Sequence, residues 1–101
     1  MATHNLATGE VGTNGVKTLT ASTEDTVNFA GDPAYTEVIV PQDSPVGLWY
    51  TNNGTAATVN GAQCFYVPPG ASDRRLSRSS GKGQVRLISS GAATYRVQEG
   101  D

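Results

Sequence analysis

The chain has 101 residues, a hydrophobic fraction of 37% and a formal net charge of −2 at pH 7. This length corresponds to one small domain, and a domain of this size is marginally stable by itself. The sequence contains no long uninterrupted apolar run, which excludes a membrane-spanning helix and any membrane partner that depends on one.

Residues 1–15 contain several Gly, Thr and Asn residues and show no sustained periodicity. We expect an extended N-terminal arm that becomes ordered only against a partner, with a folded extra strand as the alternative. The segment lacks a basic region followed by an apolar one, so we expect no secretory signal. His4, the only histidine, is expected to be an exposed tail residue, because catalysis or metal binding needs a rigid scaffold.

From residue 16 onward, short runs rich in Val, Ile, Thr, Tyr and Phe alternate with Gly-, Pro- and Asn-containing turns. Strands spaced about 8–12 residues apart with turns between them are typical of a sandwich or barrel. We therefore predict a small antiparallel β-sandwich over residues 16–101, Greek-key or immunoglobulin-like, with a small β-barrel as the alternative. The predicted strands are 16–21, 25–30, 35–40, 47–52, 56–59, 63–67, 84–89 and 93–98.

The acidic residues of the predicted strands do not form a catalytic pattern. Glu24 and Asp25 are adjacent, so their side chains should diverge, and Glu37 alternates with apolar neighbours and should face solvent. Nothing separates these groups into an acid and a base. We predict a protein that is not an enzyme and that has no cofactor and no metal.

The stretch "LWYTNNGTAATV" (residues 48–59) predicts a hairpin around an Asn-Gly turn. A two-residue turn at 53–54 matches apolar residues across the strands and leaves Trp49 on the opposite face. Trp49 then either packs in the core or under the 41–45 loop, anchors a protein interface, or stacks on a sugar ring. The expected cross-strand pairs are Leu48 with Val59 and Tyr50 with Ala57.

Two segments follow that could carry reactive or charged groups. Cys64 lies on a predicted strand, where we expect a buried small hydrophobic residue. One cysteine forms no disulfide within the chain, which is typical of proteins made in reducing cytoplasm. The basic stretch "DRRLSRSSGKG" (73–83) is expected to be a solvated loop or one that docks on protein. Nucleic acid is not an expected partner, because the whole chain is acidic and no nucleic-acid-binding motif accompanies the stretch.

The last predicted hairpin lies in "VRLISSGAATYRV" (residues 85–97). A three-residue loop at 90–92 pairs the apolar residues of the two strands with each other, whereas a two-residue turn does not. This register places Arg86 directly opposite Arg96, a like-charge pair that destabilises a sheet by up to about 1 kcal/mol. An acidic residue of the same chain or an acidic partner surface would relieve the repulsion.

Charge is distributed unevenly along the chain. Residues 1–73 contain one basic and seven acidic residues, whereas residues 74–101 contain six basic and two acidic residues. With such a division, the basic end of one copy can bind the acidic face of another copy, or it can bind a different acidic partner. Alternatively, the two groups pair within one molecule.

Three stretches resemble a group of small proteins encoded by tailed bacteriophages. They are "KTLTASTEDTVNFAGDPAYTEVIV", "LWYTNNGTAATVNGAQCFYVPPG" and "VRLISSGAATYRVQE", and the similarity spans roughly residues 17–99. The central hairpin is also similar to the "YYTTDGTTPT" hairpin of immunoglobulin-like modules appended to some glycosidases. Asn53 and Ala57 replace the Asp and Pro of that hairpin, so its sugar-related role is not implied.

The phage resemblance implies a virion structural protein made in the host bacterial cytoplasm, most plausibly a capsid decoration protein on the outside of the head. Its expected partners are the major capsid protein and further copies of itself, with a trimer favoured. The alternatives are a tail-associated carbohydrate- or receptor-binding module, a head–tail connector or tail subunit, and a small DNA-binding protein. The predicted interface residues are His4, Asn5 and Leu6 in the arm, Trp49, and the basic set Arg74, Arg75, Arg78, Arg86 and Arg96.

Overall fold

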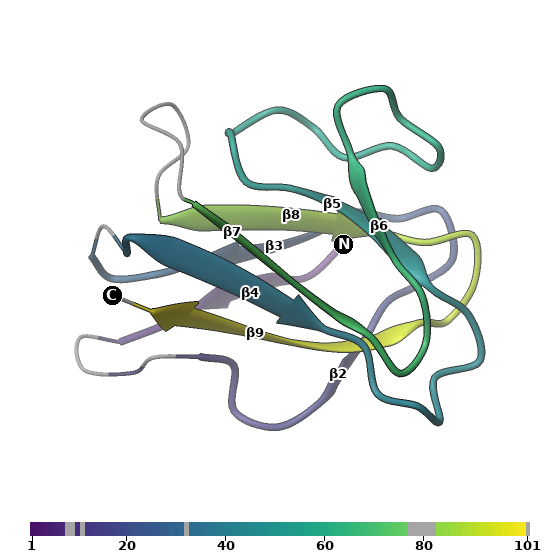
Figure 1. Ribbon diagram of the computed structural model, residues 1–101, viewed down its shortest axis with the longest axis horizontal. Helices are drawn as coiled ribbons and strands as arrows, with labels where there is room; N and C mark the ends of the chain where they lie inside the picture. The colour runs from purple at the N-terminus through teal and green to yellow at the C-terminus, as the bar shows by residue number, and fades with distance from the viewer. Residues whose placement is uncertain (8–9, 11, 32, 77–82, 101) are drawn as a thin grey trace.

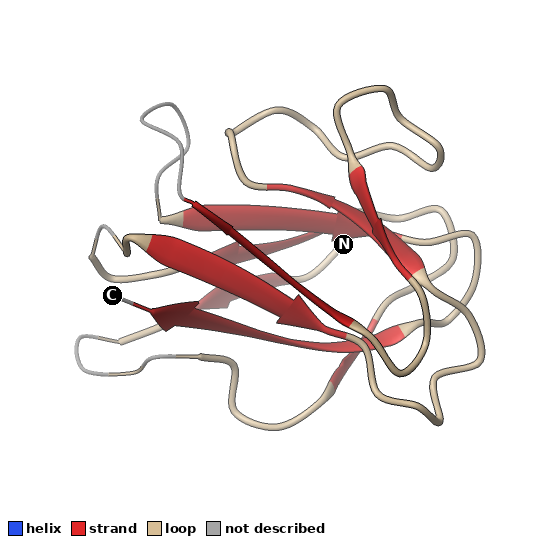
Figure 2. Cartoon of the chain, viewed as in Figure 1, coloured by secondary structure: helices blue, strands red, loops and turns tan. Residues whose placement is uncertain are grey.

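The computed structural model describes residues 1–7, 10, 12–31, 33–76 and 83–100. The regular secondary structure of these residues consists of β-strands, with no helix among them (Figures 1 and 2). The all-β prediction is confirmed for this part of the chain. The described residues include no helix of the length and apolarity needed to cross a membrane. The strands are β1 (Thr3–Asn5), β2 (Lys17–Thr18), β3 (Asp25–Asn28), β4 (Tyr35–Ile39), β5 (Leu48–Thr51), β6 (Phe65–Val67), β7 (Ser72–Leu76), β8 (Gln84–Ile88) and β9 (Thr94–Gly100).

These strands form two sheets that pack on a shared core (Figure 1). The five-stranded sheet has the order β1-β3-β8-β5-β6, and the four-stranded sheet has the order β2-β9-β4-β7. All pairs are antiparallel except β1 with β3, which is parallel. The arrangement is that of a sandwich, in which each sheet turns one face to the other.

The core lies between the sheets because the inner strands alternate with a period of two. Val85 and Leu87 of β8 are fully buried, whereas the flanking residues of that strand are half-buried. β4 shows the same alternation around Val38. This alternation is expected of strands that have one face in a core. The buried apolar set is Leu19, Val27, Phe29, Val38, Val40, Leu48, Tyr50, Val67, Val85, Leu87, Ala93, Tyr95 and Val97.

The predicted hairpin around residues 53–54 is wrong in its second strand. β5 pairs with β6, which brings Leu48 opposite Val67 and Tyr50 opposite Phe65. Residues 52–64 form a loop between the two strands. β6 offers larger apolar side chains to β5 than the 56–59 run does, and burial of larger side chains is more favourable. Leu48 and Tyr50 do face the core, as the sequence predicts.

The predicted hairpin of residues 84–98 is also wrong, because its strands belong to different sheets. β8 lies between β3 and β5, whereas β9 lies between β2 and β4. The apolar residues that appeared to match within one sheet instead meet across the core. Arg86 therefore lies opposite Thr26 and Thr51, and the expected opposition of Arg86 and Arg96 does not occur.

The segment expected to be a basic loop begins with a strand. β7 pairs with β4 and forms an edge of the four-stranded sheet. Its side chains are mostly exposed, so it lacks the apolar alternation that reveals a strand in sequence. The rest of the expected loop, including Arg78 and Lys82, lies outside the described residues.

The N-terminal segment contributes to both sheets. β1 adds to β3 at the edge of the five-stranded sheet, and Gly12 forms an isolated bridge to Gln98 of β9. The alternative of a folded extra strand is thus observed for Thr3–Asn5, and an extended arm is not confirmed. The predicted 16–21 strand is reduced to the two residues of β2.

Candidate binding surfaces

The N-terminal residues predicted to contact a partner lie in and beside β1. His4 is a quarter exposed, and its Nε2 lies 3.9 Å from Oδ2 of Asp25, between the sheets. The imidazole centroid is 6.4 Å from that of Tyr95. Leu6 packs on the core, and Asn5 is exposed. The expectation that His4 is an exposed tail residue is wrong, because pairing with β3 turns its side chain inward.

Two tyrosine–aspartate pairs join the sheets on opposite sides of the sandwich. The hydroxyl of Tyr50 in β5 donates to Oδ2 of Asp73 in β7 at 2.9 Å. The hydroxyl of Tyr95 in β9 donates to Oδ2 of Asp25 in β3, also at 2.9 Å. Each bond satisfies a buried phenol that would otherwise lack a partner.

Both phenols have pKa values well above the usual one for tyrosine. Burial is the main cause, and the neighbouring carboxylate of Asp73 or Asp25 adds to it by disfavouring a second negative charge. Asp73 also accepts a hydrogen bond from Nε of Arg75, which raises the pKa of that guanidinium. Tyr50 and Tyr95 therefore act as neutral donors in the folded protein.

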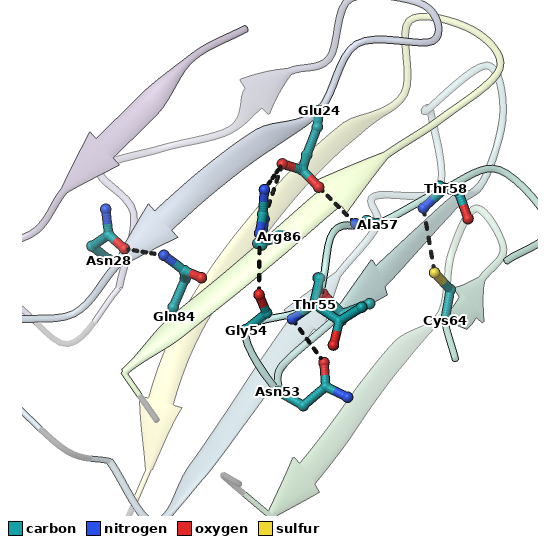
Figure 3. A network of polar contacts seen from close by, with 11 residues as sticks. Glu24, Asn28, Asn53, Gly54, Thr55, Ala57, Thr58, Cys64, Gln84 and Arg86 are labelled. Carbon is teal, nitrogen blue, oxygen red and sulfur yellow. Dashed lines mark hydrogen bonds and ion pairs between the residues drawn. The ribbon is translucent and has the colours of Figure 1, made fainter. Parts of the chain in front are cut away.

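A third polar group binds the 52–64 loop to the five-stranded sheet (Figure 3). Oε1 of Glu24 accepts hydrogen bonds from Nε and Nη2 of Arg86 at 2.9 and 2.7 Å. Oε2 of Glu24 accepts from the backbone N–H of Ala57 at 2.6 Å, and Nη1 of Arg86 donates to the Gly54 carbonyl at 3.1 Å. The Glu24 side chain is 9% exposed and that of Arg86 is 29% exposed, so solvent screens the pair only weakly.

The 52–64 loop also contains contacts of its own. The Asn53 side chain accepts a hydrogen bond from the Thr55 backbone, a local Asx-type turn. The half-buried Cys64 thiol accepts a long contact from the Thr58 backbone at 3.5 Å. Cys64 precedes β6 rather than lying on a strand, and it fills space inside the loop.

An aromatic pair lies on the outer face of the five-stranded sheet. Trp49 of β5 and Tyr66 of β6 are directly opposite each other, with ring centroids 4.8 Å apart and ring planes at 47°. Trp49 is half-buried and Tyr66 is 51% exposed. A Cβ at Gly47 would lie 2.5 Å from the Tyr66 hydroxyl, so a glycine at this position leaves room for the phenol. The two rings therefore form a positioned aromatic surface.

The basic residues predicted to share one patch are divided between the sheets. Arg74 and Arg75 lie on β7 and Arg96 on β9, and all three are exposed, whereas Arg86 lies on the other sheet. The guanidinium of Arg74 lies 4.6 Å from the ring centroid of Tyr35, and that of Arg75 lies 4.0 Å from the ring of Phe65. Cation–π contacts of this kind hold a charged group in place.

The uneven charge distribution is resolved in part within the molecule. Glu24 of the acidic region binds Arg86 of the basic region, and Asp73 binds Arg75. These two pairs support internal pairing among the alternatives drawn from the sequence. Arg74 and Arg96 remain on the outside of the four-stranded sheet.

The buried carboxylates have structural partners rather than a shared catalytic geometry. Glu24 and Asp25 diverge as predicted, one toward Arg86 and the other toward Tyr95. Within residues 1–7, 10, 12–31, 33–76 and 83–100, no group of three or more His, Cys, Asp or Glu side chains could hold a metal ion. The exposed features of these surfaces include Tyr66 of the aromatic pair and most side chains of β7.

Two contacts of these surfaces are not predicted from the sequence. The sequence offers Tyr66 or Tyr35 as the companion of Trp49 that a sugar-binding face requires, but it does not predict that Tyr66 lies directly opposite Trp49, because the partner of β5 is misassigned. Asp73 was assigned to a loop, although it ties Tyr50 to Arg75. A carboxylate beside arginines in a polar segment carries no sequence signal that distinguishes it from a solvated charge.

Comparison of the chain with protein-family models, curated proteins and solved structures finds no match.

Proposed function

We propose that this chain is a non-enzymatic structural protein of a tailed-phage virion, and specifically a capsid decoration protein that binds the outside of the head and stabilises it. The observation that carries the proposal is the sequence resemblance over residues 17–99. We also propose that the sandwich has a Greek-key or immunoglobulin-like topology. In this role many copies bridge neighbouring capsid subunits, and multivalency makes attachment through modest contacts durable.

Features of the surface are compatible with this role. Polar pairs between the sheets, such as Tyr95 with Asp25, stabilise a domain whose apolar fraction is low. Trp49 and Tyr66 offer an aromatic anchor, which is the residue type enriched in the energetically dominant parts of protein interfaces. Arg74 and Arg96 offer exposed cations for an acidic partner surface.

Co-sedimentation with empty capsids that lack the protein tests the proposal. We expect the purified chain to pellet with such capsids and to raise the temperature at which they disrupt, because ligand binding stabilises the bound state. A protein that remains in the supernatant at saturating capsid concentration contradicts the decoration role. Naked tail tubes in a parallel sample distinguish a head protein from a tail or connector subunit.

A second candidate is a carbohydrate-binding module, and the pairing of Trp49 with Tyr66 on one outer face favours it. Aromatic faces stack on the apolar faces of sugar rings. We expect a glycan array to show binding that Trp49→Ala abolishes if this function is correct, whereas Tyr35→Ala, on the other sheet, should have no effect. The absence of binding by the native chain removes this candidate.

A further inference from the structure

We propose that β7 is a self-association edge, at which two copies of this chain pair their β7 strands in antiparallel orientation and join two four-stranded sheets into one. The inference concerns the contact between copies. It rests on the proposed function only for its biological setting, in which many copies lie close together on a capsid.

Among the described residues, β7 is the longest strand at an edge of either sheet. The outermost strands of the two sheets are β1, β6, β2 and β7. The first three have two or three residues each, whereas β7 has five. An edge strand presents unpaired backbone N–H and C=O groups to another chain, and a longer one presents more of them.

Alternate residues of β7 direct their backbone groups away from β4. The N–H of Val40 donates to the carbonyl of Ala71, immediately before β7. Alternation along an antiparallel pair then turns the backbone groups of Ser72, Arg74 and Leu76 away from β4. The carbonyl of Leu76 already accepts a hydrogen bond from Nδ2 of Asn52 within the monomer, so in the new ladder it accepts a second bond through its other lone pair.

The outward backbone groups allow a register in which Arg74 lies on the two-fold axis that relates the two copies. Hydrogen-bonded pairs in the new ladder must use the outward groups, which leaves registers that differ by two residues. Only the register that pairs Arg74 with Arg74 of the second copy uses all three outward residues, and it pairs Ser72 with Leu76 of the second copy. Asp73 then lies opposite Arg75 of the second copy, and the same contact occurs twice by symmetry.

The side chains at these positions are complementary. Asp73 uses Oδ2 for Tyr50 and Arg75, and among the described residues Oδ1 takes no hydrogen bond. Arg75 donates only through Nε to these residues, so its terminal nitrogens can reach Oδ1 of the second copy. Charge-assisted bonds between guanidinium and carboxylate are among the stronger hydrogen bonds.

The like charges at the axis are held apart by contacts within each copy. The Arg74 guanidinium lies over Tyr35, and Arg74 is opposite Glu37 of β4. The contact with Tyr35 draws the cation away from the axis. Leu76, which is 64% exposed, would lie beside the small Ser72 of the second copy. Ser72 is opposite Ile39, so Leu76 of the second copy gains an apolar neighbour there.

Sedimentation or light scattering over a wide concentration range tests self-association. We expect the apparent mass to rise from 10.5 kDa toward twice that value with increasing concentration. Arg74→Pro removes an outward N–H that the monomer does not use, so the variant should fold and remain at the single-chain mass. Arg74→Ala retains the N–H and should associate at least as well as the native chain. Native protein that stays monomeric at millimolar concentration overturns the proposal.

Disulfide trapping in a Cys64→Ser background tests the register and does not depend on the proline variant folding. Arg74→Cys places two thiols at the axis, within the Cα separation that disulfides accept, so mild oxidation should yield covalent dimers. Ser72→Cys is the matched control, because the two Ser72 residues are four positions apart in this register and should not cross-link. Equal cross-linking of the two variants overturns the register.

Ser72→Pro removes another outward N–H and keeps Arg74, which is a proposed capsid contact, so capsid binding by the Ser72→Pro monomer separates this inference from the proposed function. Monomers that still bind capsids, while the native chain dimerises through position 74, support both proposals. A native chain that dimerises through position 74 but ignores capsids supports the strand pairing and removes the decoration role. A native chain that binds capsids but never dimerises overturns the strand pairing alone.

Discussion

Arg86→Ala is expected to lower the free energy of unfolding by about 3 kcal/mol, because removing one partner of a largely buried ion pair leaves the other charge uncompensated. The charge left without a partner is that of the Glu24 carboxylate, which is 9% exposed and receives two of its hydrogen bonds from Arg86. The variant also loses the bond to the Gly54 carbonyl, which helps to hold the 52–64 loop. Chemical denaturation followed by circular dichroism measures the change.

Arg96→Ala is the matched control for this prediction. Arg96 is exposed on the outer face of the other sheet, and surface substitutions of this kind usually change stability by less than about 0.5 kcal/mol. The hairpin deduced from sequence would have put the two arginines opposite each other, so that removing either one should stabilise the fold. A stabilising effect of Arg86→Ala would therefore refute the observed sheet assignment.

A double-mutant cycle with Glu24→Gln isolates the contribution of the pair. The two single variants should each be strongly destabilising, and the double variant should cost less than their sum because no charge is left unpaired. Purely additive effects would show that the loop is held by contacts other than this pair.

The second large effect is a loss of stability at alkaline pH. In the folded protein the pKa values of Tyr50 and Tyr95 are raised by burial and by their aspartate partners. In the unfolded chain both phenols ionise near pH 10. Above that pH the unfolded state binds fewer protons than the folded state, so the free energy of unfolding falls as pH rises.

The size of this effect follows from the number of groups. Each phenol that keeps its proton only in the folded state contributes about 1.4 kcal/mol per pH unit, so two contribute roughly 3 kcal/mol per unit. A domain with a stability of about 5 kcal/mol should then unfold within about two pH units above 10. Phenolate absorbance of Tyr50 and Tyr95 should appear together with the loss of the β-sheet circular dichroism signal.

Variants at the same residues provide the controls. Tyr95→Phe removes one of the two titrating groups, so the dependence of stability on pH above 10 should be about half as steep. Neutral stability should also fall, because Asp25 loses a hydrogen-bond donor. Tyr66→Phe, at a side chain that is 51% exposed, should leave the alkaline slope unchanged. An unchanged slope in Tyr95→Phe would contradict the assignment of Tyr95 as a linked group.

Several elements could be predicted from sequence because their signal is local. Runs such as 35–40 and 84–89 carry β-branched and alternating apolar residues, and both form strands close to the predicted bounds. The same alternation identified Leu48, Tyr50, Val85 and Leu87 as core residues. The divergence of Glu24 and Asp25 follows from the two faces of a strand.

The candidate site was predicted less well than the strands. The sequence singles out Trp49 and offers Tyr66 or Tyr35 as its companion on a sugar-binding face, and only the structure selects Tyr66. The basic set was placed on one surface, although Arg86 is separated from Arg74 and Arg96 by the thickness of the sandwich. These errors have three sources: the predicted strand 56–59 does not form, strand β7 is not predicted, and strands 84–89 and 93–98 are paired although they belong to different sheets.

The amino-acid sequence by itself determined the all-β class, the inward faces of the main strands and the low apolar content, because propensity and two-residue alternation depend on near neighbours. Only the tertiary structure decided which strands pair. Val85 and Leu87 can meet Val97 and Tyr95 equally well side by side in one sheet or face to face across two, since both arrangements bury the same apolar groups. The arrangement across two sheets also includes long-range polar contacts, such as that of Glu24 with Arg86, which local sequence does not predict.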